Sequence, residues 1–158
     1  MQLSTRGRYA VMAMADLACR EAARDPGAPP CRPVAVAEIA GAQRLSAQYL
    51  EQLFCKLRRC GLLCAVRGPG GGYRLARPAG QVSIADIVLA AEEELRTTGC
   101  HAGGPGCPAG EPGAQCLTHD LWDALGTEIR RFLEHVTLAD VIEGRIPTTT
   151  APRPADAA

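Results

Sequence analysis

A helical apolar stripe that ends at glycine and gives way at once to an alternating pattern constrains the fold more than any other feature of this sequence. The stripe consists of Leu50, Leu53, Phe54 and Leu57, and Gly61 stands where a left-handed residue ends a helix. After Gly61 the apolar period changes to two, in "LLCAVR" and "YRLAR" on either side of "GPGGG". This change predicts a helix followed directly by a β-hairpin with a glycine tip.

A shorter helix is predicted immediately before the striped one. The segment "VAVAEIAGAQ" places Val36, Ile39 and Ala40 on an inward face, and Ser46 can cap the helix that follows a brief turn. The outer face of the striped helix is polar and basic, and consists of Gln48, Glu51, Gln52, Lys56, Arg58 and Arg59. Two helices joined by a tight turn indicate a helix-turn-helix, and the hairpin is then a wing.

The glycine-rich tip allows a second interpretation, a phosphate-cradling loop of a nucleotide-binding enzyme. The tip lacks both the G-x-x-x-x-G-K-[ST] pattern and the G-x-G-x-x-G spacing, so we predict no enzyme. In a wing, the backbone at Gly70 and Gly71 can approach DNA closely. Arg67, Arg74 and Arg77 can then reach phosphates or a minor groove.

The charge distribution supports a nucleic-acid partner. Residues 1–80 contain 12 Lys and Arg against 5 Asp and Glu, whereas residues 81–158 contain 5 against 12. A basic half beside an acidic half indicates that the first meets a polyanion while the second does something else. We therefore predict double-stranded DNA as the partner of the N-terminal half.

Further helices are predicted on both sides of this region. The segment "STRGRYAVMAMADLACREAA" predicts a helix capped by Ser4 or Thr5, and Ser83 can cap a helix over "IADIVLAAEEEL". Thr118 or His119 begins a long helix, and Thr137 caps a short last one. The long helix has an apolar set wider than its neighbour can cover, made of Leu121, Trp122, Leu125, Ile129, Phe132, Leu133 and Val136. A homodimer interface would cover this set.

The predicted fold class is therefore mainly α with a small β-hairpin wing: a winged helix-turn-helix domain plus a long dimerisation helix. The winged domain is predicted over residues 1–80, a cysteine-containing loop with dimerisation helices over residues 81–145, and a disordered Pro/Thr/Ala tail over residues 146–158. No apolar run approaches the ~20 residues needed to cross a bilayer, so we expect a cytoplasmic protein without a membrane partner.

The stretch "CHAGGPGCPAGEPGAQCLTH", residues 100–119, has too few packing side chains to order itself. Fixing each residue costs roughly 1 to 2 kcal/mol of backbone entropy, so the loop is ordered only if disulfides or a metal clamp it, and it stays disordered if nothing does. The chain has eight cysteines but no convincing export signal, and in a reducing compartment clustered cysteines favour metal or redox chemistry.

Four segments, "RGRYAVMAM", "SAQYLEQLFCKLRRCGLL", "VRGPGGGYRLAR" and "CLTHDLW", resemble the IscR family across residues 1–143. Members of that family are dimeric winged-helix transcriptional regulators that sense iron-sulfur clusters. The resemblance implies a homodimer on a palindromic operator, control of iron-sulfur cluster biogenesis genes in the manner of a repressor or activator, and the iron-sulfur assembly machinery as cluster donor.

The resemblance also implies site residues. A 2Fe-2S cluster would be held by Cys100, Cys107, Cys116 and His119. The DNA-binding positions would be Ser46, Gln48, Tyr49, Glu51, Gln52, Lys56, Arg67, Gly70 and Gly71. Their chemistry is consistent with this role, since Glu accepts from a cytosine amino group, Gln pairs with adenine and Arg suits guanine or a narrow minor groove.

Several alternatives stay open. The spacing C-x6-C-x8-C-x2-H is wider than in the family pattern, and His101 is an alternative ligand to His119. Zinc or bare thiols could replace the cluster, and the signal could be nitric oxide, iron or redox state. An electron-transfer iron-sulfur protein is a further possibility, in which the basic helix would have no role. The remaining cysteines are expected to be small buried hydrophobes, namely Cys19, Cys31, Cys55, Cys60 and Cys64.

Overall fold

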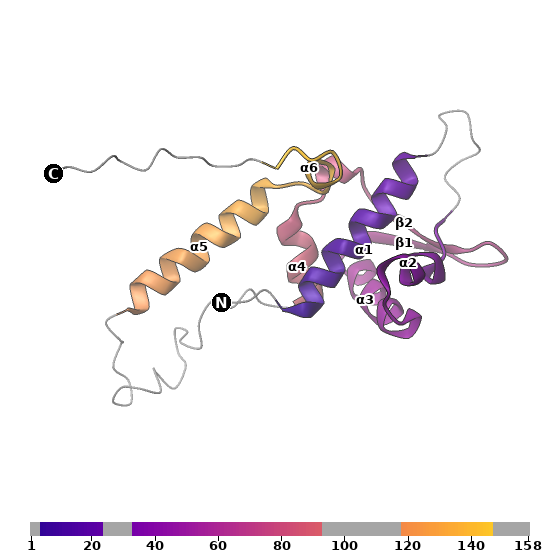
Figure 1. Ribbon diagram of the computed structural model, residues 1–158, viewed down its shortest axis with the longest axis horizontal. Coiled ribbons are helices and arrows are strands. Elements are labelled where there is room, and N and C mark those ends of the chain that lie inside the picture. The colour runs from indigo at the N-terminus through magenta and orange to yellow at the C-terminus, as the bar shows by residue number, and fades with distance from the viewer. Residues whose placement is uncertain (1–3, 24–32, 93–117, 147–158) are drawn as a thin grey trace.

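This computed structural model describes residues 4–23, 33–92 and 118–146, and consists of helices and a small antiparallel hairpin whose tip extends to one side, past α2 and α3 (Figure 1). In chain order the elements are α1 (Thr5–Ala22), α2 (Val36–Gln43), α3 (Ala47–Arg59), β1 (Leu63–Val66), β2 (Gly72–Leu75), η1 (Ala79–Gln81), α4 (Ile84–Glu92), α5 (His119–His135) and α6 (Leu138–Ile142). The mainly α fold with a β-hairpin wing, predicted from the sequence, is confirmed.

Helix α1 lies at the centre of the core. It packs against α2, α3, α4 and α6, and its small and apolar residues are fully buried, namely Ala10, Ala13, Met14 and Leu17. The predicted stripe of α3 faces the same core, with Leu50, Phe54 and Leu57 at 0% exposure. Because burial on one side fixes the rotation of α3, its polar side faces solvent.

The turn between α2 and α3 is set by local backbone geometry and by polar contacts to α1. Arg44 ends α2 in the left-handed region with φ of 55°. Asp16 of α1 accepts hydrogen bonds from Arg20 Nε at 2.7 Å and from Gln43 Nε2 at 3.3 Å. Arg20 also pairs with Glu38 of α2 at 3.6 Å. These contacts hold α2 against α1, and α2 in turn supports α3.

The hairpin pairs β1 with β2 in antiparallel register, and a short third segment joins it. The sequence predicted a helix from Val34 onward, but α2 begins at Val36, and Val34 instead pairs with Tyr73. The two residues exchange both backbone hydrogen bonds, each at 2.8 Å. Val34 is fully buried, so burial and pairing outweigh the helical period of the segment.

Two reciprocal caps lie side by side where α4 and α6 begin. Ser83 and Thr137 form an isolated antiparallel bridge, in which Ile84 donates to Val136 O at 2.9 Å and Leu138 donates to Val82 O at 2.8 Å. The predicted Ser83 cap is confirmed, since Asp86 N donates to Ser83 Oγ at 3.0 Å. This junction joins the chain after the wing to the segment between α5 and α6.

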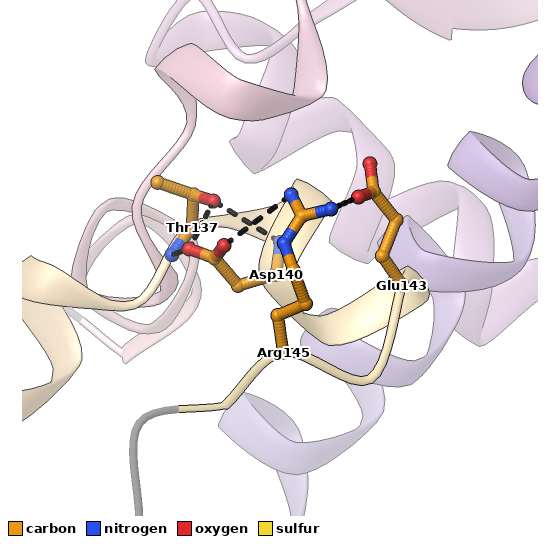
Figure 2. Close-up of polar contacts among 4 residues, drawn as sticks. All are labelled: Thr137, Asp140, Glu143 and Arg145. Carbon is orange, nitrogen blue, oxygen red and sulfur yellow. Dashed lines mark hydrogen bonds and ion pairs between the residues drawn. The ribbon is translucent and has the colours of Figure 1, made fainter.

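Figure 2 shows the cap of α6. The Thr137 hydroxyl donates to the Asp140 carboxylate at 2.6 Å and the Thr137 N–H at 3.0 Å, while Arg145 pairs with both Asp140 and Glu143. The Thr137 hydroxyl, then its N–H and Arg145, hold the pKa of Asp140 below its ordinary value. At pH values above the ordinary pKa of an aspartate, this lowered pKa stabilises the folded state. The contribution is lost as the pH falls through the lowered pKa of Asp140.

Helix α5 projects away from the helices around α1 (Figure 1). Of its residues only Leu133 is buried, whereas Leu121, Trp122 and Phe132 are 60%, 42% and 43% exposed. Three of the seven apolar residues predicted on this helix are therefore exposed in a single chain, whereas Leu133 and Val136 are buried. No helix within the described residues is long and apolar enough to span a membrane.

Candidate nucleic-acid interface and cluster ligands

The outer face of α3 presents the polar side chains that the sequence predicts. The Ser46 hydroxyl caps the helix by accepting from Tyr49 N at 3.1 Å. Gln48, Glu51 and Gln52 are exposed in the first two turns, on the end of the helix that meets base edges when a helix-turn-helix enters a major groove. Their side chains are therefore available to a partner.

Two of the predicted DNA-binding residues on α3 also contact the body of the protein. The Tyr49 ring packs edge-on against Tyr9 of α1, with centroids 6.2 Å apart. Lys56 is half-buried, and its Nζ donates to Ala91 O of α4 at 3.4 Å. These side chains therefore have fixed positions at the border between α3 and its neighbours.

The backbone geometry of the wing tip itself requires glycine, whether or not DNA is bound. Gly68 and Gly70 have φ of 104° and 78°, values that favour glycine. A Cβ on Gly71 would lie 2.4 Å from Val66 O. By contrast, a Cβ on Gly70 would meet nothing within 4 Å, and Arg67 is exposed beside it. The tip therefore presents open backbone and one cation to the surroundings.

The three wing arginines differ in their surroundings. Arg67 and Arg74 are exposed. Arg77, which the sequence places with them as a candidate DNA contact, is instead held at the base of the wing. Its guanidinium lies 3.6 Å from Asp86 and donates to Gln81 O at 3.4 Å. Arg77 thus links the end of the hairpin to the first turn of α4.

Of the four proposed cluster ligands only His119 lies within the described residues. It is the first residue of α5 and is half-buried. Cys100, Cys107, Cys116 and the alternative ligand His101 lie outside the described residues, as does Cys31. Inside the described ranges, no group of three or more His, Cys, Asp or Glu side chains comes close enough to hold a metal.

The cysteines in the described part of the chain are free thiols. Cys55 and Cys64 are half-buried, but Cys19 and Cys60 are exposed. The prediction that these residues are small buried hydrophobes is therefore wrong for Cys19 and Cys60. Helical position explains the difference, because Cys19 faces away from the buried side of α1 and Cys60 follows the last turn of α3.

Comparison with known sequences points to one family. The family model for Rrf2, described as an iron-dependent transcriptional regulator, matches residues 3–144. An HTH-type transcriptional regulator IscR from Cereibacter sphaeroides is 43% identical over 146 residues, which cover 92% of this chain and 90% of that protein. An IscR from Salmonella paratyphi B is 40% identical over 161 residues, which cover 97% of this chain and 91% of that protein.

Solved structures with the same fold include IscR and CymR regulators. T. potens IscR superposes with a TM-score of 0.69 at 32% identity, over 92% of this chain and 88% of that one. CymR, the global cysteine regulator of B. subtilis, also superposes with a TM-score of 0.69. It is 27% identical, and the match covers 91% of this chain and 98% of CymR. With the winged helix, the exposed face of α3 and the family match together, the chain belongs to the Rrf2 family of DNA-binding transcriptional regulators.

Proposed function

We propose that this protein is a homodimeric cytoplasmic regulator that binds a palindromic operator and senses iron-sulfur cluster status, without enzymatic activity. The observation that carries the proposal is the exposed polar face of α3 beside an open wing, in a chain 43% identical to an IscR. Residues 1–80 would bind DNA and residues 81–145 would hold the cluster loop and the dimer helices. The regulated genes would be those of iron-sulfur cluster biogenesis.

The division of roles on DNA follows from side-chain chemistry. Glu51 and Gln52 would read base edges, since a carboxylate accepts from cytosine and an amide pairs with adenine. Arg67 at the wing would contact a phosphate or the minor groove. The other proposed contacts would position the helix and the wing on the backbone; they are Ser46, Gln48, Tyr49, Lys56, Gly70 and Gly71.

Glu51→Ala is expected to change operator preference more than overall affinity. A carboxylate near phosphates disfavours most sequences, so its loss should remove discrimination at one base pair by about 10- to 100-fold while binding to other sequences is kept or improved. Affinities for duplexes that differ at single base pairs measure this effect. Arg67→Ala serves as the comparison and should weaken binding to all of the duplexes. If Glu51→Ala lowered the affinity for every duplex equally, Glu51 would not select between operator sequences.

The proposed ligands fit an iron-sulfur cluster by their donor chemistry. Three thiolates and one imidazole match the ligands that such clusters take in proteins, and histidine among cysteines raises the reduction potential. When bound, the cluster would supply a group whose presence reports iron and sulfide supply and redox state. Cys100, Cys107, Cys116 and His119 would hold it, with His101 as the competing nitrogen ligand.

Helix α5 offers a route from these ligands to the DNA-binding part. It begins at His119 and leads to Thr137, which pairs with Ser83 at the start of α4. Asp86, one turn further, pairs with Arg77 at the base of the wing. We infer that ligation through His119 biases the position of α5 and, through this junction, the presentation of the wing and α3.

Cys107→Ala should abolish cluster binding while leaving the fold intact. The anaerobically purified wild-type protein is expected to contain two iron and two sulfide per protomer, and the variant close to none, with an unchanged far-ultraviolet circular dichroism spectrum. Cys19→Ala is the matched control, because Cys19 is an exposed thiol on α1 outside the proposed ligand set. If the wild-type protein contained stoichiometric zinc and no sulfide, these residues would hold zinc and not an iron-sulfur cluster.

A second candidate function is a regulator of the same fold that senses nitric oxide or iron through its cluster, or redox state through bare thiols. The match to the B. subtilis global cysteine regulator favours keeping it, since this fold serves more than one signal. Duplex affinity that changes with thiol oxidation in protein free of iron and sulfide would support this candidate. An electron-transfer protein, in contrast, would bind no duplex at moderate salt.

A further inference from the structure

A small hollow lies where the first turn of α1 meets the outer side of α3. It has a volume of about 170 Å³ and is lined by Arg6, Tyr49, Gln52, Leu53 and Lys56. A second, more open hollow of about 510 Å³ is lined by Ser4, Thr5, Arg6 and Tyr49. Arg6 and Tyr49 thus line both hollows.

The side chains around the smaller hollow form a cationic donor set from two helices. Arg6 is exposed, and a guanidinium carries five N–H donors in a planar fork that matches a phosphate. Lys56 adds a second cation from α3, and its Nζ donates to Ala91 O at 3.4 Å. Within the described residues, no carboxylate lines either hollow. The nearest acid on the same face of α3 is Glu51, which is exposed outside the hollow.

The wall of the hollow is held in place by packing. Tyr49 contacts the Tyr9 ring edge-on, with an angle of 85° between the ring planes. Tyr9 lies one turn after Arg6 on α1, and Gln52 and Lys56 follow Tyr49 at i+3 and i+7 on α3. One face of α3 therefore runs along the first turn of α1, and the packed pair of tyrosines fixes the distance between the two helices.

Continuity with the proposed DNA-reading face identifies the ligand. Gln52 lines the hollow and is also a proposed base-reading residue. The major groove is about 12 Å wide and bordered by phosphates, so a cation on the helix beside Gln52 meets the DNA backbone rather than a base edge. We propose that Arg6, with the Tyr49 hydroxyl beside it, binds a backbone phosphate at the edge of the groove that α3 enters. This site deepens the proposed function and rests on DNA binding through α3.

Arg6→Ala in the full-length protein tests the site. Two probes are used: a duplex selected from a random pool by the wild-type protein, and a random-sequence duplex of equal length. The variant should bind both about tenfold more weakly at one salt concentration, because a phosphate contact contributes no sequence information. A plot of log affinity against log salt should become shallower by about one unit for each protomer bound.

Two further variants separate a phosphate site from general charge. Arg6→Lys keeps the cation and should keep the wild-type salt slope. Arg8→Ala removes an equal charge from an exposed residue two positions further on, which points to the other side of α1 and lines neither hollow. Its affinity should stay within about twofold of the wild type. Equal thermal unfolding midpoints for all variants show that the fold is kept.

The outcomes distinguish a failure of the Arg6 site from a failure of the proposed DNA binding through α3. Wild-type affinity and salt slope in Arg6→Ala would overturn the Arg6 site and leave DNA binding through α3 intact. An equal loss in Arg8→Ala would also overturn the site, because it would show that any charge on α1 has the same effect. A wild-type protein that binds neither duplex would overturn the proposed function together with the site.

Discussion

Gly72→Ala is expected to lower the free energy of unfolding by about 3 kcal/mol, in the range of substitutions that force main-chain movement. A Cβ at this position would lie 2.2 Å from Val34 O, 2.5 Å from Val34 C and 2.9 Å from Ala35 N. All three are main-chain atoms, so no side chain can rotate away. The segment before α2 would have to separate from β2, which breaks the two hydrogen bonds between Val34 and Tyr73.

Urea unfolding of the full-length protein measures this effect, with Gly41→Ala as the matched control. Gly41 lies within α2, and a Cβ there would meet nothing within 4 Å. Alanine is a better helix former than glycine, so the control should gain about 0.5 to 1 kcal/mol. A loss of stability in Gly72→Ala and a gain in Gly41→Ala would confirm that the segment at Val34 pairs with β2. A Gly72→Ala variant as stable as Gly41→Ala would show that Val34 does not pair with Tyr73 in solution.

The same region shows where sequence patterns stop being sufficient. The apolar period of α3 depends only on neighbours in the chain, and its buried stripe and Gly61 terminus are as predicted. Val34 directly precedes a helical pattern of apolar residues, and the sequence-based prediction includes it in that helix. Its pairing with Tyr73 depends on β2 reaching the segment before α2, which is a long-range contact without a local signal.

The candidate site divides in the same way. Glu51 and Gln52 could be predicted to be exposed because the buried stripe fixes the rotation of α3. Arg6 could not be placed beside them, since its neighbourhood depends on how α1 packs against α3. Arg77 looked equivalent to Arg67 in sequence, yet the approach of α4 pairs it with Asp86. The cluster ligands follow from resemblance alone and stay a prediction.

Phe132→Asp is expected to raise the dissociation constant of the proposed homodimer by at least about 100-fold. Leu121, Leu125 and Phe132 lie at i, i+4 and i+11 on α5, within roughly 40° around the helix axis. Leu121 and Phe132 are more than 40% exposed in the single chain. An aromatic side chain near the centre of an interface contributes about 2 to 4 kcal/mol, and a buried unpaired carboxylate adds a further cost.

Analytical ultracentrifugation over a range of concentrations measures the dimer, and DNA binding reports its consequence. A dimer holds its second reading head at millimolar effective concentration near the second half-site. Affinity for a full palindrome should therefore fall by about 100-fold or more in Phe132→Asp, whereas affinity for a single half-site should be nearly unchanged. Retained half-site binding also shows that the winged domain of the variant is folded.

Thr127→Asp is the matched control for this substitution. Thr127 is exposed on α5, roughly 140° around the helix from Phe132, and the change introduces the same charge. This control should remain dimeric and bind the palindrome as the wild type does. If both variants stay dimeric, the apolar face of α5 does not form the dimer. If both dissociate, added charge anywhere on α5 is sufficient and the face has no special role. Only dissociation of Phe132→Asp alone supports two copies of α5 packed along the stripe formed by Leu121, Leu125 and Phe132.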